Sequence, residues 1–229
     1  MIVGTGLIAR AFSPLYADDE ATIVFASGVS NSAETSDAAF ARERDLVLHH
    51  IARKPERLVY FGSCNVANPN QKSAYFEHKR SMERLVGDAA FGLVIRLPQV
   101  VGATNNPNTL TNHLAHQIMT GQMVKLWTRA RRNLIDIDDV VAITHHILAN
   151  ASAFPRRVSV ASPWTLSMRE ILEIFESVLG RRAEAIEIDR GDDMHIDASL
   201  SEQIATDIGL DFGKDYPYRV VEKYYGGSR

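Results

Sequence analysis

Short apolar segments alternate with amphipathic helical patterns along the first half of this chain. The apolar segments are rich in Val, Ile and Leu and predict strands at 1–4, 22–27, 58–62 and 93–97. The intervening patterns predict helices at 7–12, 36–52, 73–86 and 109–120. Leu58 to Phe61 are apolar at consecutive positions, as in strands that are buried on both faces. The alternation therefore predicts an α/β fold with a parallel sheet and helices on both faces.

The second half of the chain predicts a smaller set of elements. A strand is expected at 156–161, a helix at 167–179 with Gly180 as its cap, a strand at 185–188 and a last helix near 199–208. With 229 residues, of which 45% are hydrophobic, the chain can bury one core together with a small appended lobe.

Charge and cysteine content narrow the functional classes. The net charge is −3 and the basic residues are scattered, so the sequence carries no nucleic-acid-binding signature. No segment is apolar enough to span a membrane, and the first residues lack the pattern of a signal peptide. A single cysteine, Cys64, excludes an internal disulfide and fits a reducing compartment. We expect a cytoplasmic protein without a nucleic-acid or membrane partner.

A glycine turn joins the first predicted strand to the first predicted helix. In Gly4-Thr5-Gly6-Leu7-Ile8-Ala9, the first glycine permits a tight turn, the second lets a pyrophosphate approach, and Ala9 lets the helix pack closely. This is a Rossmann-type dinucleotide signature, although a tight turn with small packing residues would have the same sequence. The acidic ribose ligand that usually ends the second strand is missing, and Asp18 to Glu20 are better read as a solvated turn.

A Ser–Tyr–Lys set follows the glycine turn. Tyr75 and Lys79 have the YxxxK spacing, which places both on one helix face, where the cation should lower the pKa of the phenol. Ser63 follows a buried strand and could hydrogen-bond the same substrate oxygen that exchanges a proton with Tyr75. The alternative is an amphipathic helix with Tyr75 at the edge of the core and Lys79 in solvent. The order of glycine turn, strand ending in Ser and YxxxK helix favours catalysis.

In this order, the segments resemble the extended short-chain dehydrogenase/reductase family, which is also described as NAD-dependent epimerases/dehydratases. The resemblance covers nearly the whole chain. Besides the glycine turn and the Ser73–Lys79 helix, it is carried by Phe25-Ala26-Ser27-Gly28, Phe61-Gly62-Ser63-Cys64, Arg96-Leu97-Pro98-Gln99-Val100-Val101-Gly102, the segment 131–140 and Trp164-Thr165-Leu166-Ser167. The chain departs from the family where Val3 and Ala9 replace the outer glycines and where Gln99 replaces an Asn. It also has no room for two strands between the glycine turn and Ala26.

The resemblance implies a shortened Rossmann domain over 1–161, with an excursion of about 103–131 toward the substrate, and a small substrate-capping lobe over 162–229. The implied cofactor is NAD or NADP, and the choice between them stays open because the missing strands would carry the discriminating residue. The implied catalytic residues are Ser63, Tyr75 and Lys79. The implied cofactor-binding residues are Gly4, Thr5, Gly6, Leu7, Ile8, Ala26, Ser27, Gly28, Tyr75, Lys79 and Pro98.

The resemblance also implies a nucleotide-sugar substrate, whose diphosphate Arg132 would bind. The further implied substrate residues are Cys64, Gln99, Asn112 and His113. Cys64 is alternatively a small buried side chain, and His113 a polar residue of the pocket or of the helix surface. Dehydration ranks last, because Cys64 and Asn65 stand where the family's dehydratases carry an acid pair. The remaining reactions are 4-keto reduction and 4-epimerisation, in surface-polysaccharide or deoxysugar biosynthesis.

Three further expectations complete the interpretation. The adjacent pairs His49-His50 and His145-His146 each point to two faces of a helix, so no metal site is expected. A homodimer is expected through helices 36–52 and 73–86, whose apolar residues Phe40, Leu46, Val47, Met82 and Leu85 exceed one core face. A non-catalytic dinucleotide-binding module with a regulatory role is the alternative to an enzyme.

Overall fold

The computed structural model describes residues 1–193 and 195–227 and divides into two compact units. Unit 1 comprises Met1–Leu97 and Val141–Val160, and unit 2 comprises Pro98–Val140 and Ala161–Arg229. The segment that leaves unit 1 is thus longer than the excursion of about 103–131 that the sequence predicted, because strands on both sides of that excursion also belong to unit 2.

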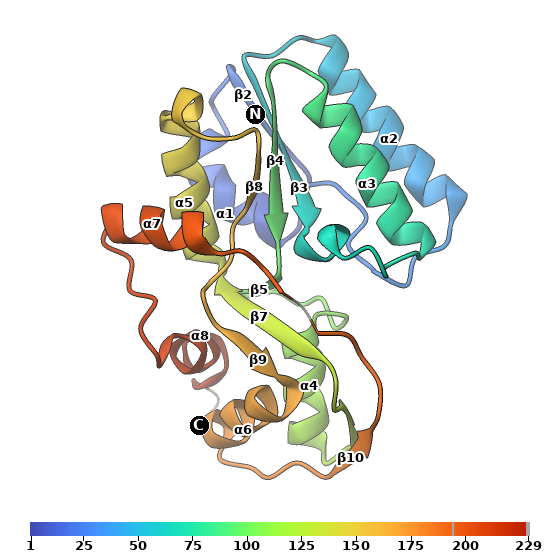
Figure 1. Ribbon diagram of the computed structural model, residues 1–229, viewed down its shortest axis with the longest axis vertical. Coiled ribbons are helices and arrows are strands. Elements are labelled where there is room, and N and C mark those ends of the chain that lie inside the picture. The colour runs from blue at the N-terminus through green and yellow to red at the C-terminus, as the bar shows by residue number, and fades with distance from the viewer. Residues whose placement is uncertain (194, 228–229) are drawn as a thin grey trace. The chain divides into compact units, whose positions relative to one another are not determined.

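Unit 1 is built on a five-stranded parallel sheet (Figure 1). Its strands, in spatial order, are β1 (Ile2–Val3), β2 (Thr22–Phe25), β3 (Arg57–Ser63), β4 (Gly92–Leu97) and β8 (Arg157–Ser159). The central register pairs Phe25 with Tyr60 and Ser63 with Leu97. The predicted Rossmann-like parallel sheet is confirmed.

Helices cover both faces of this sheet. On one face lie α2 (Asp37–Ala52) and α3 (Ala74–Gly87), and on the other lie α1 (Leu7–Tyr16) and α5 (Ile137–Ala149). Successive β3 residues face opposite layers: the Tyr60 hydroxyl bonds Glu43 of α2, whereas the Phe61 ring packs on Phe12 of α1, with centroids 5.2 Å apart. The first of these layers has a core of Val47, Met82 and Val86 against apolar residues of β2, β3 and β4.

The order of the strands never reverses in this sheet. Only α1 and a turn separate β1 from β2, so β1 stands at the sheet edge and each strand neighbours the next one of the unit. In doubly wound folds the cofactor crosses the point where the strand order reverses. Within the described residues no strand lies beyond β1 in this sheet, so the two strands for which the sequence left no room are absent.

Unit 2 combines two small sheets with helices. One sheet has the order β5 (Gln99–Val101), β7 (Arg131–Asp136) and β9 (Thr165–Ser167), and the other pairs β6 (Val124–Trp127) with β10 (Ala185–Ile188). The helices are α4 (Leu110–Thr120), α6 (Met168–Leu179), α7 (Ser199–Asp207) and α8 (Tyr216–Tyr225). Their apolar faces share one core, which includes Leu114, Leu134, Phe175 and Val221.

Local signals explain several boundaries in unit 2. Ser167 and Glu170 form a reciprocal capping box at the start of α6, and Gly180 ends that helix with a φ of 63°, as predicted. The sequence interpretation missed α8, although Pro217 in its first turn and the apolar spacing of Tyr216, Val220 and Val221 favour a helix.

The structure corrects part of the reasoning for a dimer. Val47 and Met82 are core residues, with exposed fractions of 0% and 1%. Leu46 and Leu85 are partly buried against the same core, and Phe40 is partly buried against a separate cluster that includes Tyr75 and Phe76. The large apolar residue that α2 does expose is Leu48.

Candidate functional site

The carboxyl edge of the unit 1 sheet gathers most of the predicted cofactor and catalytic residues. The glycine turn follows β1, the loop Ala26–Gly28 follows β2, and Ser63 ends β3. Tyr75 and Lys79 lie in the first turns of α3, which is reached from Ser63 through the short helix η1 (Cys64–Ala67). Because the strands are parallel, these segments meet at the same edge of the sheet.

The two glycines of the turn serve different purposes. Gly4 has a φ of 126°, and a Cβ there would lie 2.4 Å from the carbonyl oxygen of Ala26, so the fold itself requires glycine. Gly6 has an ordinary φ of −76° as the N-cap of α1, and a Cβ there would meet no atom within 4 Å. The space beside Gly6 and the first N–H groups of α1 fits a pyrophosphate.

Ser63 and Cys64 differ in accessibility. Ser63 is half-buried, and its Oγ accepts a hydrogen bond of 3.3 Å from the Asn65 N–H, which leaves the hydroxyl hydrogen able to bond a substrate oxygen. Cys64 is 6% exposed, and burial raises the pKa of its thiol to about 12 despite a hydrogen bond with Ser159. The structure favours the interpretation of Cys64 as a small buried side chain over that of a substrate residue.

Lys79 lies on the same side of α3 as Tyr75, with its Nζ 5.8 Å from the centroid of the Tyr75 ring. It is not in solvent: its exposed fraction is 3%. Its ammonium donates hydrogen bonds of 3.0 Å to Glu43 Oε1 and 3.1 Å to the Tyr60 hydroxyl. Sequence reasoning missed Glu43, because no local pattern links α2 to a lysine of α3.

The predicted lowering of the Tyr75 pKa is wrong. Tyr75 is 7% exposed, and burial, followed by the negative charge of Glu43, raises the pKa of its phenol to about 12. The Lys79 charge does not reverse this, because Glu43 neutralises it at hydrogen-bonding distance. At neutral pH the phenol is therefore protonated and able to donate a proton.

Unit 2 carries the predicted residues Pro98, Gln99, Asn112, His113 and Arg132. Arg132 lies on β7, where burial lowers the pKa of its guanidinium and Asp192 partly offsets this effect. Its Nη1 donates to the carbonyl oxygen of Arg131 at 2.7 Å, and no ion pair engages it among the described residues. Gln99, on β5, and Pro98, just before it, are half-buried.

The side-chain amide of Asn112 is engaged by hydrogen bonds within the fold. Its amide nitrogen donates to the carbonyl oxygens of Thr104 and Asn106, both at 2.8 Å. Its amide oxygen accepts a hydrogen bond of 2.6 Å from the Tyr225 hydroxyl. His113, one residue further, is exposed on α4, in agreement with the helix-surface alternative.

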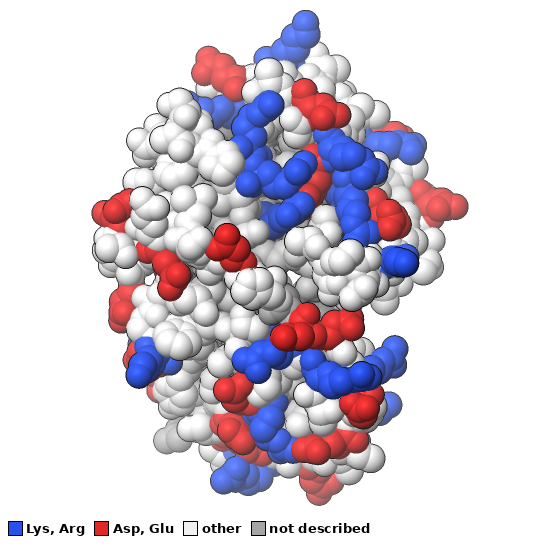
Figure 2. Space-filling model, viewed as in Figure 1, with Lys and Arg blue, Asp and Glu red and all other residues white. Residues whose placement is uncertain are grey.

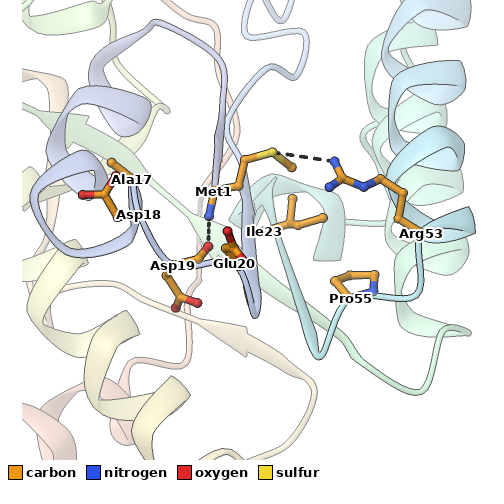
Figure 3. A pocket seen from close by; sticks show the side chains of 8 residues that line it. All are labelled: Met1, Ala17, Asp18, Asp19, Glu20, Ile23, Arg53 and Pro55. Atoms are coloured by element: carbon orange, nitrogen blue, oxygen red, sulfur yellow. Dashed lines mark hydrogen bonds between the residues drawn. The ribbon is translucent and has the colours of Figure 1, made fainter.

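A pocket of about 620 Å³ opens at the opposite edge of the unit 1 sheet (Figure 3). It is lined by residues that precede β1, β2 and β3, among them Met1, Asp19 and Arg53. Asp19 accepts hydrogen bonds from the N–H groups of Ala21 and Thr22, at 2.8 and 3.0 Å. Asp18 to Glu20 are thus a turn at the amino ends of the strands, where a ribose ligand is not expected.

Basic side chains gather over unit 1 on the face seen in Figure 2, whereas basic and acidic side chains are mixed over unit 2. Part of the basic charge of unit 1 is balanced locally, because Arg96 and Arg157 both pair with the buried carboxylate of Glu83. Within the described residues, no cluster of His, Cys, Asp or Glu could hold a metal ion, and no helix has the length and apolarity to cross a membrane.

Comparison with known proteins gives a family and a fold. A sequence model of the NAD dependent epimerase/dehydratase family matches residues 20–161, more than half of the chain. The match begins after the glycine turn. A comparison with curated proteins gave no match.

Solved structures similar to this chain include three sugar-nucleotide enzymes. A UDP-glucuronic acid 4-epimerase from Bacillus cereus has a TM-score of 0.72 at 14% identity, covering 93% of this chain and 76% of its own. A dTDP-glucose 4,6-dehydratase from Bacillus anthracis has a TM-score of 0.71 at 13% identity, covering 97% of this chain and 78% of its own. A UDP-glucose 4-epimerase from Thermus thermophilus has a TM-score of 0.67 at 15% identity, covering 97% of this chain and 82% of its own. At these identities the likeness establishes the fold.

Proposed function

The chain belongs to the NAD-dependent epimerase/dehydratase family, and we propose that it is an oxidoreductase or epimerase acting on a nucleotide sugar with NAD or NADP. The observation that carries the proposal is the meeting of the glycine turn, Ser63 and Tyr75 at one edge of the sheet. The similar structures support the substrate class: the relatives from Bacillus cereus and Thermus thermophilus are named as UDP-sugar 4-epimerases, and both were crystallised with NAD.

The residues of this site suit the proton-transfer half of a redox reaction, in which the cofactor transfers the hydride. When bound, the cofactor supplies or accepts the hydride at the sugar carbon. The N–H groups at the start of α1 would hold its pyrophosphate beside Gly6. The Ser63 hydroxyl donates a hydrogen bond to the sugar oxygen, and Tyr75 transfers a proton to that oxygen as the carbonyl becomes an alcohol.

The two reactions left open by the sequence, 4-keto reduction and 4-epimerisation, both use Ser63 and Tyr75. The phenol of Tyr75, whose pKa burial raises, is protonated at neutral pH and can donate a proton to a ketone oxygen. A 4-epimerase must in addition remove a proton from the sugar hydroxyl. Dehydration needs an added acid and base, and neither the buried Cys64 nor Asn65 supplies them.

Three finer points belong to the same proposal. Arg132 would bind the substrate diphosphate, because a guanidinium can bond two phosphate oxygens at once. A homodimer would form through α2 and α3, with the exposed Leu48 at the contact. The product would enter surface-polysaccharide or deoxysugar biosynthesis in the cytoplasm, a compartment that fits the single reduced cysteine.

A regulatory dinucleotide-binding module is the second candidate, and one observation favours it: the Lys79 charge beside Tyr75 is neutralised by Glu43. The module would bind NADH or NADPH, detected by cofactor fluorescence, and turn over no keto-sugar.

The experiment that separates these functions is a substrate panel. Purified protein is incubated with NADPH or NADH and with UDP-, dTDP- and GDP-linked 4-keto sugars. Absorbance at about 340 nm follows the cofactor, and mass spectrometry follows the sugar. A two-hydrogen gain in the sugar with matching loss of reduced cofactor supports the reductase. Cofactor binding without turnover across the panel contradicts it and supports the module.

A further inference from the structure

Glu43 is a fully buried carboxylate that receives hydrogen bonds from two elements and a loop. Its exposed fraction is 0%. Oε1 accepts from the Tyr60 hydroxyl of β3 at 2.7 Å and from the Lys79 ammonium of α3 at 3.0 Å. Oε2 accepts from the Val29 N–H at 2.6 Å and lies 3.0 Å from Nε2 of His78, also on α3. A carboxylate has about four lone-pair sites, and all four are used.

The loop Ala26–Val29 closes directly on the ion pair of Glu43 and Lys79. A Cβ on Gly28 would lie 2.8 Å from Lys79 Nζ and 2.9 Å from Glu43 Oε1, so only glycine lets the loop pack this closely. The short bond from the Val29 N–H to Glu43 then fixes the loop from its other end. Glu43 thus connects the loop that follows β2 to the helix that carries Tyr75.

The ion pair of Glu43 and Lys79 lies within a cluster of charged groups whose charges nearly cancel. From α2, Glu43 faces the ammonium and Arg42 lies further away; from α3, Glu83 contributes at a distance; and from β3 the Tyr60 hydroxyl accepts its hydrogen bond. The centroid of the Tyr75 ring lies 5.8 Å from Nζ. Of these groups, Glu43 is the one whose negative charge acts on both Lys79 and Tyr75.

We propose that Glu43 is a positioning residue of the proposed active site, which holds the Lys79 ammonium and the Ala26–Val29 loop together and cancels the positive charge that Lys79 alone would place beside Tyr75. The inference rests on the proposed function, in which Tyr75 is the proton donor. It assigns to Glu43, in addition to burial, a role in keeping that donor protonated.

The direct test is the titration of Tyr75 by NMR with ¹³Cζ-labelled tyrosine, assigned by comparison with Tyr75→Phe. In the parent protein Tyr75 should titrate at about 12. In Glu43→Gln, which keeps the shape of the side chain, the titration should move down by about one pH unit or more. The matched control is Glu77→Gln, which removes an exposed carboxylate from the same helix as Tyr75 and should leave the titration in place. An unchanged Tyr75 titration in Glu43→Gln overturns the proposal.

A second measurement covers the case in which Glu43→Gln does not fold. The double variant Glu43→Gln/Lys79→Met removes both charges, so no unpaired buried charge remains. It should fold, with a Tm at least as high as that of Lys79→Met, which leaves the Glu43 carboxylate buried without its cation, and the amide proton of Val29 should move upfield from its position in the parent. A double variant that does not fold, or that melts below Lys79→Met, overturns the pairing role.

Neither measurement uses a substrate, so the two proposals fail separately. If the substrate panel shows no turnover but the Tyr75 titration shifts as expected, the proposed function is wrong and the role of Glu43 stands. If turnover is found and the Tyr75 titration does not shift, the role of Glu43 is wrong and the proposed function stands.

Discussion

Replacing Gly6 by valine should weaken cofactor binding while leaving the fold nearly intact. The structure supplies the reason, because a Cβ on Gly6 meets no protein atom within 4 Å and the residue already has an ordinary φ of −76°. The side chain would instead occupy the space into which the pyrophosphate must come.

The expected magnitudes are distinct for stability and binding. Valine is a poorer N-cap than glycine, so unfolding should become easier by about 1 kcal/mol or less. For a chain of this size, that corresponds to a fall in Tm of roughly 2–4 °C. The affinity for NADH should fall at least about tenfold, equivalent to about 1.4 kcal/mol. A fluorescence titration with NADH and a thermal melt measure the two quantities.

The contrasting variant is Gly4→Ala. Its Cβ would lie 2.4 Å from the Ala26 carbonyl oxygen at a φ of 126°, so this change should cost more than about 3 kcal/mol of stability. If Gly6→Val binds NADH as tightly as the parent, the assignment of the turn to the pyrophosphate is wrong. If Gly4→Ala is as stable as the parent, the argument from backbone geometry is wrong.

Three further outcomes are expected. Arg132→Ala should raise the KM for the nucleotide sugar about tenfold or more and leave the Kd of the cofactor unchanged, and an equal loss of both would count against its role at the diphosphate. Cys64, with its pKa raised from 9.0 to about 12, should react with iodoacetamide at pH 8 about a thousandfold more slowly than an exposed thiol, and the rate should rise with pH up to about 12; fast alkylation of the folded protein would contradict its burial. Light scattering at micromolar concentration should give the mass of a dimer, which Leu48→Glu should convert to a monomer, and a monomeric parent would rule out the α2 and α3 interface.

The parts of the fold that could be predicted depend on local patterns. The strands of unit 1 are apolar over consecutive residues because helices cover both faces, and Gly180 ends α6 because a left-handed residue is needed there. Hydrophobic periodicity and cap residues in the sequence indicate both features. The small sheets of unit 2 were less predictable, since β5 and β9 have only three residues each and gain their conformation by pairing with β7.

For the predicted site, the sequence indicated which side chains lie close together and did not indicate their electrostatics. The YxxxK spacing places Lys79 beside Tyr75, and this proximity is observed. The spacing carries no information on the burial of Tyr75 or on Glu43, which lies 36 residues before Lys79, and burial and Glu43 together raise the phenol pKa. In the same way, the sequence of α4 suggests a substrate role for Asn112, and only the tertiary structure brings Tyr225 to its amide.

The central claim is that Tyr75 transfers the proton in a 4-keto/4-hydroxy redox step on a nucleotide sugar. The most direct measurement is the turnover of Tyr75→Phe on the substrate found by the panel, together with its NADH affinity and its Tm. The account predicts a fall in turnover of roughly two to four orders of magnitude, with affinity and Tm close to those of the parent. Near-parent turnover by Tyr75→Phe would contradict the mechanism.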